Sequence, residues 1–218
     1  MPRVGRADVV VGVVAAALFC LVAVAVVTGW PPLAEIDRAG AAWGERNGGA
    51  QSWWVPVWTT VSAVFGPLAF RIAAVVALVW MLVSRRRGAS RAEASTLFFA
   101  SATVLLGGIV PVAVKAVVDR PRPEAALVDA LHSSFPSAHA FGITTAALVG
   151  RVSVAAWRAT GGVAGALVVL MCAARVALAV HYVSDVTAGV CLAVVWVLVA
   201  RLLWQRLSAS SAAPARSR

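Results

Sequence analysis

The chain has 218 residues and a formal net charge of +10 at pH 7, with 61% hydrophobic and 13% charged residues. With a mean hydropathy of +0.87, it has too little polar surface to cover a soluble globule. This composition excludes a soluble basic domain that binds nucleic acid, and it indicates a protein of the lipid bilayer.

Six apolar segments are each long enough to cross about 30 Å of hydrocarbon as a helix. They cover residues 9–28, 66–83, 96–118, 138–154, 161–180 and 185–203. The tryptophan-rich residues 53–65 are expected to lie at the membrane interface, before a second span that starts near Pro67. We therefore expect an all-α, polytopic membrane protein, with a six-helix transmembrane domain over residues 1–206 and a disordered cytoplasmic tail over residues 207–218.

The distribution of basic residues predicts the orientation of these spans. The first segment follows Arg3 and Arg6 as a signal peptide would, but it is long for one and no cleavage site follows, so we expect a retained helix. With a cytoplasmic N-terminus, twelve basic residues lie in inner segments and five in outer ones, namely Arg38, Arg46, Lys115, Arg120 and Arg122. The positive-inside rule favours this arrangement in the inner (plasma) membrane.

Residues 115–123 (KAVVDRPRP) form the first of three polar strings at the outer ends of the spans. Lys115, the only lysine of the chain, lies near the end of the third span, and the prolines that follow oppose continuation of its helix. Lys115 offers a point charge and Arg122 a planar fork, and both suit phosphate oxygens. Taken by itself, this string is also explained by two basic side chains that only anchor the end of a helix at the membrane interface.

Residues 136–139 (PSAH) form the second string, where the chain re-enters the membrane as the fourth span. Ser137 is a plausible N-cap, so the backbone N–H groups from Ala138 onward would point outward and attract an anion. His139 would lie in the first turn, where a histidine can also serve only as a cap or an interfacial residue.

Residues 175–185 (RVALAVHYVSD) form the third string, between the fifth and sixth spans. Arg175 is predicted inside the membrane, which is unfavourable unless its charge is paired or faces a ligand. The spacing of His181 and Asp185 permits a hydrogen bond that fixes the imidazole tautomer, although an incidental ion pair in a short turn has the same spacing. On the predicted topology, all three strings meet on the extracytoplasmic side, and we expect the active site there.

Together, Lys115-x6-Arg122-Pro123, Pro136-Ser137-Ala138-His139 and Arg175-x5-His181-x3-Asp185 resemble the signature of the phosphatidic acid phosphatase type 2 superfamily. This family also includes soluble acid phosphatases and vanadium haloperoxidases. The resemblance covers residues 66–203, with the signature at residues 115–185. Ala138 replaces a common Gly, and Ala174 replaces a common Ser; these two departures bear on the rate or the substrate choice more than on the reaction type.

The resemblance implies a role for each site residue. His181 would be the nucleophile that forms a phosphohistidine, Asp185 would orient it, and His139 would protonate the leaving oxygen and then assist water. The phosphoryl oxygens would be bound by Lys115, Arg122, Ser137, Arg175 and the Ala138 N–H. Asp119, Glu124 and Asp129 are scattered along one loop, so we expect neither a metal site nor a cofactor.

The sequence therefore predicts a lipid phosphatase that hydrolyses a lipid phosphate monoester or diphosphate. Undecaprenyl diphosphate is placed ahead of phosphatidate and phosphatidylglycerol phosphate by analogy within the family. Two alternatives are a lipid phosphotransferase that uses the same intermediate and a non-catalytic lipid-binding membrane protein. The membrane spans disfavour a haloperoxidase, and the sequence does not indicate an oligomeric state.

Overall fold

The computed structural model describes residues 3–88, 90–131, 133–153 and 161–210, and these residues form helices joined by loops. The described residues contain no strand, and the predicted all-α class is confirmed. The helices are α1 (Arg6–Val27), α2 (Pro31–Ala50), α3 (Trp54–Val64), α4 (Pro67–Arg86), α5 (Arg91–Gly107), α6 (Ile109–Val118), α7 (Ala138–Ser153), α9 (Gly161–Ala177) and α10 (Val183–Ser210).

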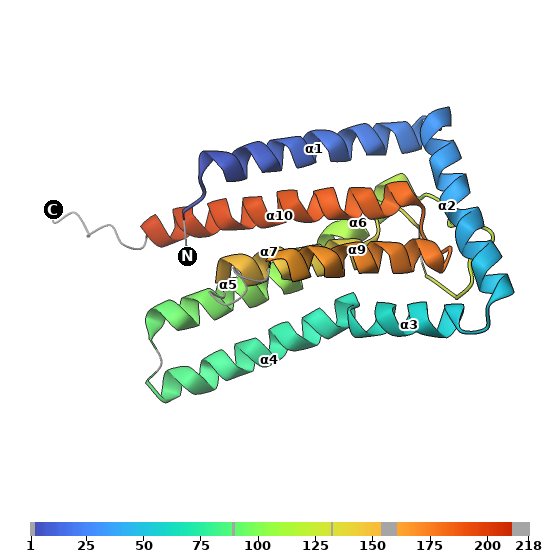
Figure 1. Cartoon of the computed structure of the whole chain (residues 1–218). Coiled ribbons are helices and arrows are strands. Elements are labelled where there is room, and N and C mark those ends of the chain that lie inside the picture. Colours follow the sequence, from blue (N-terminus) through green and yellow to red (C-terminus); the bar gives the residue numbers. More distant parts are fainter. Residues whose placement is uncertain (1–2, 89, 132, 154–160, 211–218) are drawn as a thin grey trace.

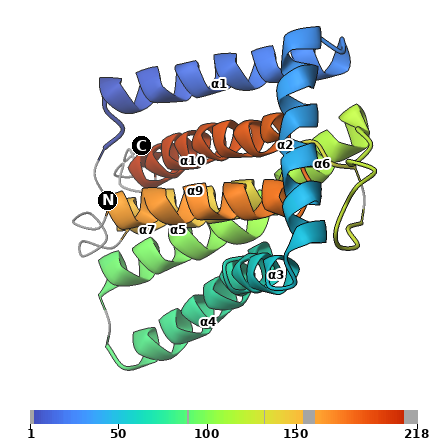
Figure 2. The same ribbon diagram turned by 45° about the vertical axis from the view of Figure 1, so that its right-hand side comes forward.

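The long helices run along a common direction and form a bundle, and α2 crosses one end of it (Figure 1). Helix α10 packs against α1 and α7, α7 also packs against α5 and α9, and α4 packs mainly on α5. The view in Figure 2 shows the same crossing of α2 in front of the ends of α9 and α10. The start of α1 and the end of α10 lie together at the opposite end.

Within the described residues, four helical segments are long and apolar enough to cross a membrane, which supports a multi-pass membrane protein. They are α1, α3 with α4, α5 with α6, and α10, whereas α9 is apolar but shorter. Helix α7 has 16 residues, and residue 154 of the predicted fourth span lies outside the described residues. The count of six spans stays a prediction.

Helix α3 and helix α4 follow one another along the bundle with a break between them (Figure 1). Pro67 begins α4, as expected for a proline in the first turn of a helix. The tryptophan-rich segment before it forms one candidate span with α4, which differs from the predicted separate interfacial segment.

Helix α2 was not predicted, because its sequence contains four glycines and lacks a continuous apolar stripe. Gly40, Gly44 and Gly48 lie four residues apart and therefore share one face. A Cβ added at Gly44 would lie 2.5 Å from the carbonyl oxygen of Val176, at the end of α9. The glycines thus allow the backbone of α2 to approach α9 closely, and tertiary packing selects the helix.

At the other end of the chain, α10 continues to Ser210, so residues 207–210 of the predicted tail are helical. Residues 211–218 lie outside the described residues.

Candidate active site

The three polar strings meet at the end of the bundle that α2 crosses. They surround a cavity of about 500 Å³, whose wall includes α3 and α6. Six of the eight predicted site residues line this cavity, namely Lys115, Arg122, Ala138, His139, Arg175 and His181. The other two, Ser137 and Asp185, are fully buried behind its wall.

The loop after α6 begins at Asp119, whose left-handed φ of 41° ends the helix and redirects the chain. Backbone carbonyls then hold the two predicted cations of this string in place. Lys115 Nζ donates to the carbonyl oxygen of Ser133, while Arg122 donates from Nη1 to that of Val180 at 2.6 Å and from Nη2 to that of Leu131 at 2.8 Å. The charged groups are therefore positioned before any ligand arrives.

The start of α7 has the geometry predicted for an N-cap. The Ser137 hydroxyl accepts a hydrogen bond from the Ala140 N–H at 3.4 Å, and α7 begins at Ala138. The Ser137 N–H donates to the backbone oxygen of Asp185 at 3.0 Å. The second string is thus attached directly to the third, and Ala138 stays on the cavity wall.

Arg175 projects from the last turn of α9 and is only 6% exposed. Its Nε has no hydrogen-bond partner among the described residues. A buried guanidinium with an unsatisfied donor is unfavourable unless an anion binds to it. Since Arg175 lines the cavity, its unsatisfied donor favours an anionic ligand there.

His181 and Asp185 form a buried pair in the turn between α9 and α10. His181 Nδ1 lies 3.4 Å from Asp185 Oδ2, and the two residues are 2% and 0% exposed. This carboxylate assigns the imidazole proton to Nδ1, which leaves the lone pair of Nε2 toward Arg122, whose Nη1 lies 3.3 Å away. Burial lowers the pKa of His181 to about 4, although the hydrogen bond and charge of Asp185 act in the opposite direction.

His139 lies in the first turn of α7, half-buried at the cavity wall. The break between α3 and α4 approaches its ring, because a Cβ added at Gly66 would lie 3.6 Å from His139 Nε2 and 2.5 Å from the Ser62 carbonyl oxygen. The α3–α4 break therefore lies beside the imidazole at the cavity.

The sequence did not indicate Ser62 as a site residue. Its hydroxyl is buried, lines the cavity and has no hydrogen-bond partner among the described residues. No motif marks it, because it comes from α3, far from the three strings in the sequence.

The sequence also did not indicate the contacts of Arg120, Asp37 and Ser184 behind the cavity. Arg120 donates to Asp185 Oδ1 at 2.7 Å and to Asp37 Oδ2 at 2.8 Å. The only signal for Arg120 is its place beside Arg122 in the proline-rich loop, and Asp37 belongs to the unpredicted α2.

The charges around the cavity are suited to an anion. Among the described residues, three cations, Lys115, Arg122 and Arg175, line it together with the carboxylate of Asp129. Among the residues that the structure describes, no three His, Cys, Asp or Glu side chains are grouped as a metal ion would require. The side chains present are those that bind phosphate oxygens.

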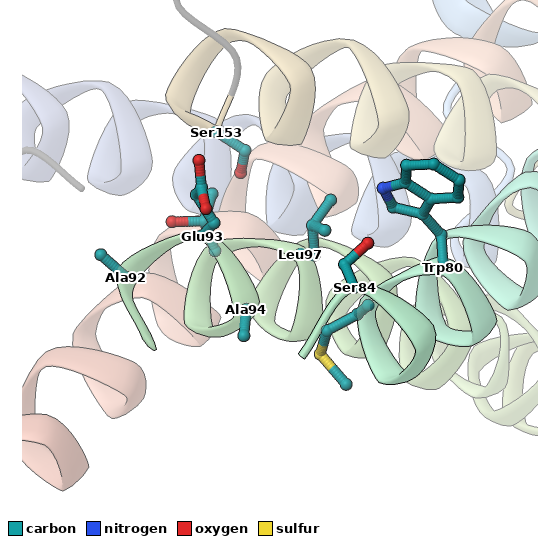
Figure 3. Close-up of a pocket in the computed structure, with 9 residues that line it drawn as sticks. Trp80, Ser84, Ala92, Glu93, Ala94, Leu97 and Ser153 are labelled. Carbon is teal, nitrogen blue, oxygen red and sulfur yellow. The ribbon is translucent and has the colours of Figure 1, made fainter. Parts of the chain in front are cut away.

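A second cavity, of about 490 Å³, lies toward the opposite end of the bundle between α4, α5 and α7 (Figure 3). Figure 3 shows Trp80 and Ser84 from α4, Glu93 and Leu97 from α5 and Ser153 from α7 around it. Glu93 accepts hydrogen bonds from Ser90 at the start of α5, so its carboxylate serves as a helix cap. The described residues that line this cavity include no cation.

Comparisons with known proteins agree with this arrangement. The family model of the PAP2 superfamily matches residues 95–209, just over half of the chain. The solved structure of a transmembrane PAP2 type phosphatidylglycerolphosphate phosphatase from Bacillus subtilis is similar to this chain, with a TM-score of 0.68. The two are 22% identical, and the match covers 95% of this chain and 98% of that chain. No match is found among curated proteins. The sequence match, together with the three strings that the fold brings around one cavity, shows that the chain belongs to the PAP2 superfamily.

Proposed function

We propose that this protein is an integral-membrane phosphatase that hydrolyses a lipid phosphate monoester or diphosphate through a phosphohistidine intermediate. The observation that carries the proposal is the placement of three cations and two histidines around one cavity, with Asp185 buried behind His181. Membership of the PAP2 superfamily and the fold shared with a PAP2-type phosphatase support it.

In the first step, the Nε2 lone pair of His181 attacks the phosphorus atom, and the bond to the leaving oxygen breaks. The protonated His139 gives its proton to that oxygen, which leaves as the lipid alcohol or lipid monophosphate. Asp185 accepts the hydrogen bond from Nδ1 and stabilises the positive charge that develops on the imidazole. The cations of the cavity hold the phosphoryl oxygens throughout.

In the second step, a water molecule attacks the phosphorus atom of phosphohistidine. His139, now neutral, accepts a proton from this water, and the bond between phosphorus and His181 Nε2 breaks. Inorganic phosphate leaves, and both histidines return to their starting states. The summed reaction consumes one water and yields one phosphate and the dephosphorylated lipid.

The walls of the cavity support a lipid substrate. Beyond the charged residues, its lining includes Thr59 and Ala63 of α3 and Val112 of α6, on segments that are long and apolar enough to span the membrane. A phosphate head can therefore reach the cations while its tail stays in the hydrocarbon. Undecaprenyl diphosphate, phosphatidate and phosphatidylglycerol phosphate all fit this description, and the similar solved structure is that of a phosphatidylglycerolphosphate phosphatase.

We also propose that the cavity faces the extracytoplasmic side of the plasma membrane. Arg85 and Arg86 end α4, and Arg91 begins α5, at the end of the bundle opposite α2 (Figure 1). An arginine-rich end is typical of the cytoplasmic face.

The direct test is phosphate release by the purified protein from the three lipids, with His181→Ala as the control. We expect release from at least one lipid by the wild-type protein and none by the variant. Transfer of the phosphate to an added lipid or sugar acceptor, with little free phosphate, would identify a phosphotransferase. Wild-type protein that binds the lipids without either reaction would identify the non-catalytic alternative.

A further inference from the structure

Helix α2 contributes a buried carboxylate to a network that ends on the proposed nucleophile. Asp37 is 1% exposed and bonds to the start of α10: the Ser184 N–H donates to its Oδ1 at 2.9 Å, and the Ser184 hydroxyl donates to its Oδ2 at 2.5 Å. Arg120 joins Asp37 to Asp185, with Nη2 on the first carboxylate and Nη1 on the second.

Arg120 is held in this position from four directions. Besides the two carboxylates, its Nη1 donates to the Ser184 hydroxyl at 2.7 Å, and its guanidinium lies 4.0 Å from the ring centre of Tyr182. Burial lowers the pKa of Arg120, but Asp185 and Asp37 outweigh this effect, so the pKa is raised. The guanidinium is thus a fixed, permanently charged bridge between two buried carboxylates.

This bridge determines how Asp185 faces His181. Arg120 occupies Oδ1 of Asp185, and the Tyr182 N–H donates to Oδ2 at 2.9 Å, on the side that faces His181 Nδ1. The carboxylate plane is therefore fixed by two donors besides the imidazole. Asp37 also shares the charge of Arg120, which leaves more of the negative charge of Asp185 available to the imidazole.

We infer that Asp37 and Arg120 are positioning residues for the His181–Asp185 pair, through which α2 supports phosphoryl transfer. The inference rests on the proposed function, because it assigns the network to the nucleophile of that reaction. Among the described residues, those that line the cavity include Arg122 but neither Arg120 nor Asp37. Loss of the network should therefore slow the chemical step and leave substrate binding nearly unchanged.

The test compares Asp37→Asn, which keeps the shape of the side chain, with Glu35→Gln, which removes a carboxylate from the exposed face of the same helix. We expect Asp37→Asn to lower kcat by about 10- to 100-fold, with KM within about twofold of wild type. Glu35→Gln should leave both constants unchanged. Arg120→Lys should lower kcat as Asp37→Asn does, because an ammonium group cannot bridge two carboxylates as a planar fork does.

A double variant separates positioning from general stability. In an Asp185→Asn background, Asp37→Asn should lower kcat by less than about twofold, because its effect passes through the lost charge. The inference would be overturned if the reductions in kcat caused by Asp37→Asn and Asp185→Asn multiplied in the double variant. A folded Asp37→Asn protein with wild-type kcat would overturn it as well. If Asp37→Asn does not fold, Ser184→Ala takes its place, since it keeps all three charges but removes the hydroxyl between them. A wild-type kcat in that variant would again overturn the inference.

Phosphate release by the wild-type protein distinguishes failure of the proposed function from failure of the positioning role. Wild-type protein that releases no phosphate contradicts the proposed function, and the positioning role with it. Normal release by wild type and by Asp37→Asn contradicts the positioning role alone.

Discussion

His181 Nδ1 lies 3.4 Å from Asp185 Oδ2, so the residue that ends the turn after α9 and the residue in the first turn of α10 act as one unit. The contact directs the other ring nitrogen of His181 toward the cavity and toward Arg122. The reaction proposed for this protein depends on that orientation, because only a nitrogen without a proton can attack phosphorus.

The two histidines of the cavity should differ in their importance. His181→Ala should abolish both turnover and the covalent intermediate. His139→Ala should lower kcat by about 10²- to 10⁴-fold, which is the usual contribution of general acid–base catalysis. The leaving group of an activated aryl phosphate needs less protonation as it departs. This substrate should therefore partly restore the activity of His139→Ala but not that of His181→Ala. Asp185→Asn should fall between them, because it keeps the hydrogen-bonding shape but loses the charge. Phosphate release and acid-quench trapping measure these effects, and a labelled intermediate in His181→Ala would show that another residue is the nucleophile.

The pH dependence should reflect the neutral state of His181. Because its pKa is lowered to about 4, the imidazole is deprotonated above that pH, and on the acidic side kcat/KM should fall as the pH drops through about 4. Asp185→Asn removes the negative charge that opposes the lowering by burial, Arg175 and Arg122, so the acidic fall should move to lower pH. The measurement is kcat/KM against pH for both proteins, with a check that each remains folded. A fall that moves to higher pH in the variant would contradict this assignment.

Hydrolysis should persist in EDTA, because cations already line the cavity where phosphate binds. Vanadate should inhibit, since it mimics the trigonal bipyramidal transition state of phosphoryl transfer. The measurement is phosphate release under three conditions: with EDTA, with vanadate, and without either compound. Activity that disappears with EDTA and returns with Mg²⁺ would refute a mechanism that needs only the side chains.

Labelling of introduced cysteines should reveal the orientation in the membrane. Glu124 lies in the exposed loop beside the cavity, and Arg87 lies at the end of α4. In a background with the native cysteines replaced by alanine, Glu124→Cys should react with an impermeant reagent from outside, and Arg87→Cys only after permeabilisation. The reverse pattern would place the active site in the cytoplasm.

Alanine at Gly44 should destabilise the protein, although alanine favours helices. Its Cβ would lie 2.5 Å from the Val176 oxygen and 2.9 Å from the Ala177 oxygen, so α2 would have to move away from α9. Such overpacking typically costs about 1–3 kcal/mol. Gly49 of the same helix has no atom within 4 Å of an added Cβ, so Gly49→Ala should keep or raise the stability. Thermal unfolding in detergent compares the two, and an equal Tm for both variants would argue against close packing of α2 on α9.

The sequence predicted the parts of the site that depend on local structure. Ser137 occupies the N-cap at the start of α7, and His181 and Asp185 lie close enough for the contact that their spacing permitted. Membership of the superfamily, which the three strings indicated, is confirmed by the family match. The roles of the individual residues stay predictions.

The contacts that depend on tertiary packing could not be predicted. Four glycines make α2 a poor helix on its own, and its burial of Asp37 depends on the close approach to α9. In the loop after α6, Arg120 and Arg122 are separated only by a proline, and nothing in their sequence distinguishes their partners. They follow the left-handed turn at Asp119. Arg120 forms an ion pair with Asp185, whereas Arg122 lines the cavity.

The position of α2 bears on any attempt to reduce this protein to a minimal enzyme. A fragment of residues 95–209, the part that matches the family model, would keep all eight predicted site residues. It would lack Asp37, on which Arg120 and Ser184 converge, and Trp54, whose Nε1 donates to the Ala177 oxygen at 2.8 Å. Transplanting the motif-bearing half onto another helical scaffold would therefore carry over the reacting groups without their support, and a working chimera needs a substitute for residues 1–94.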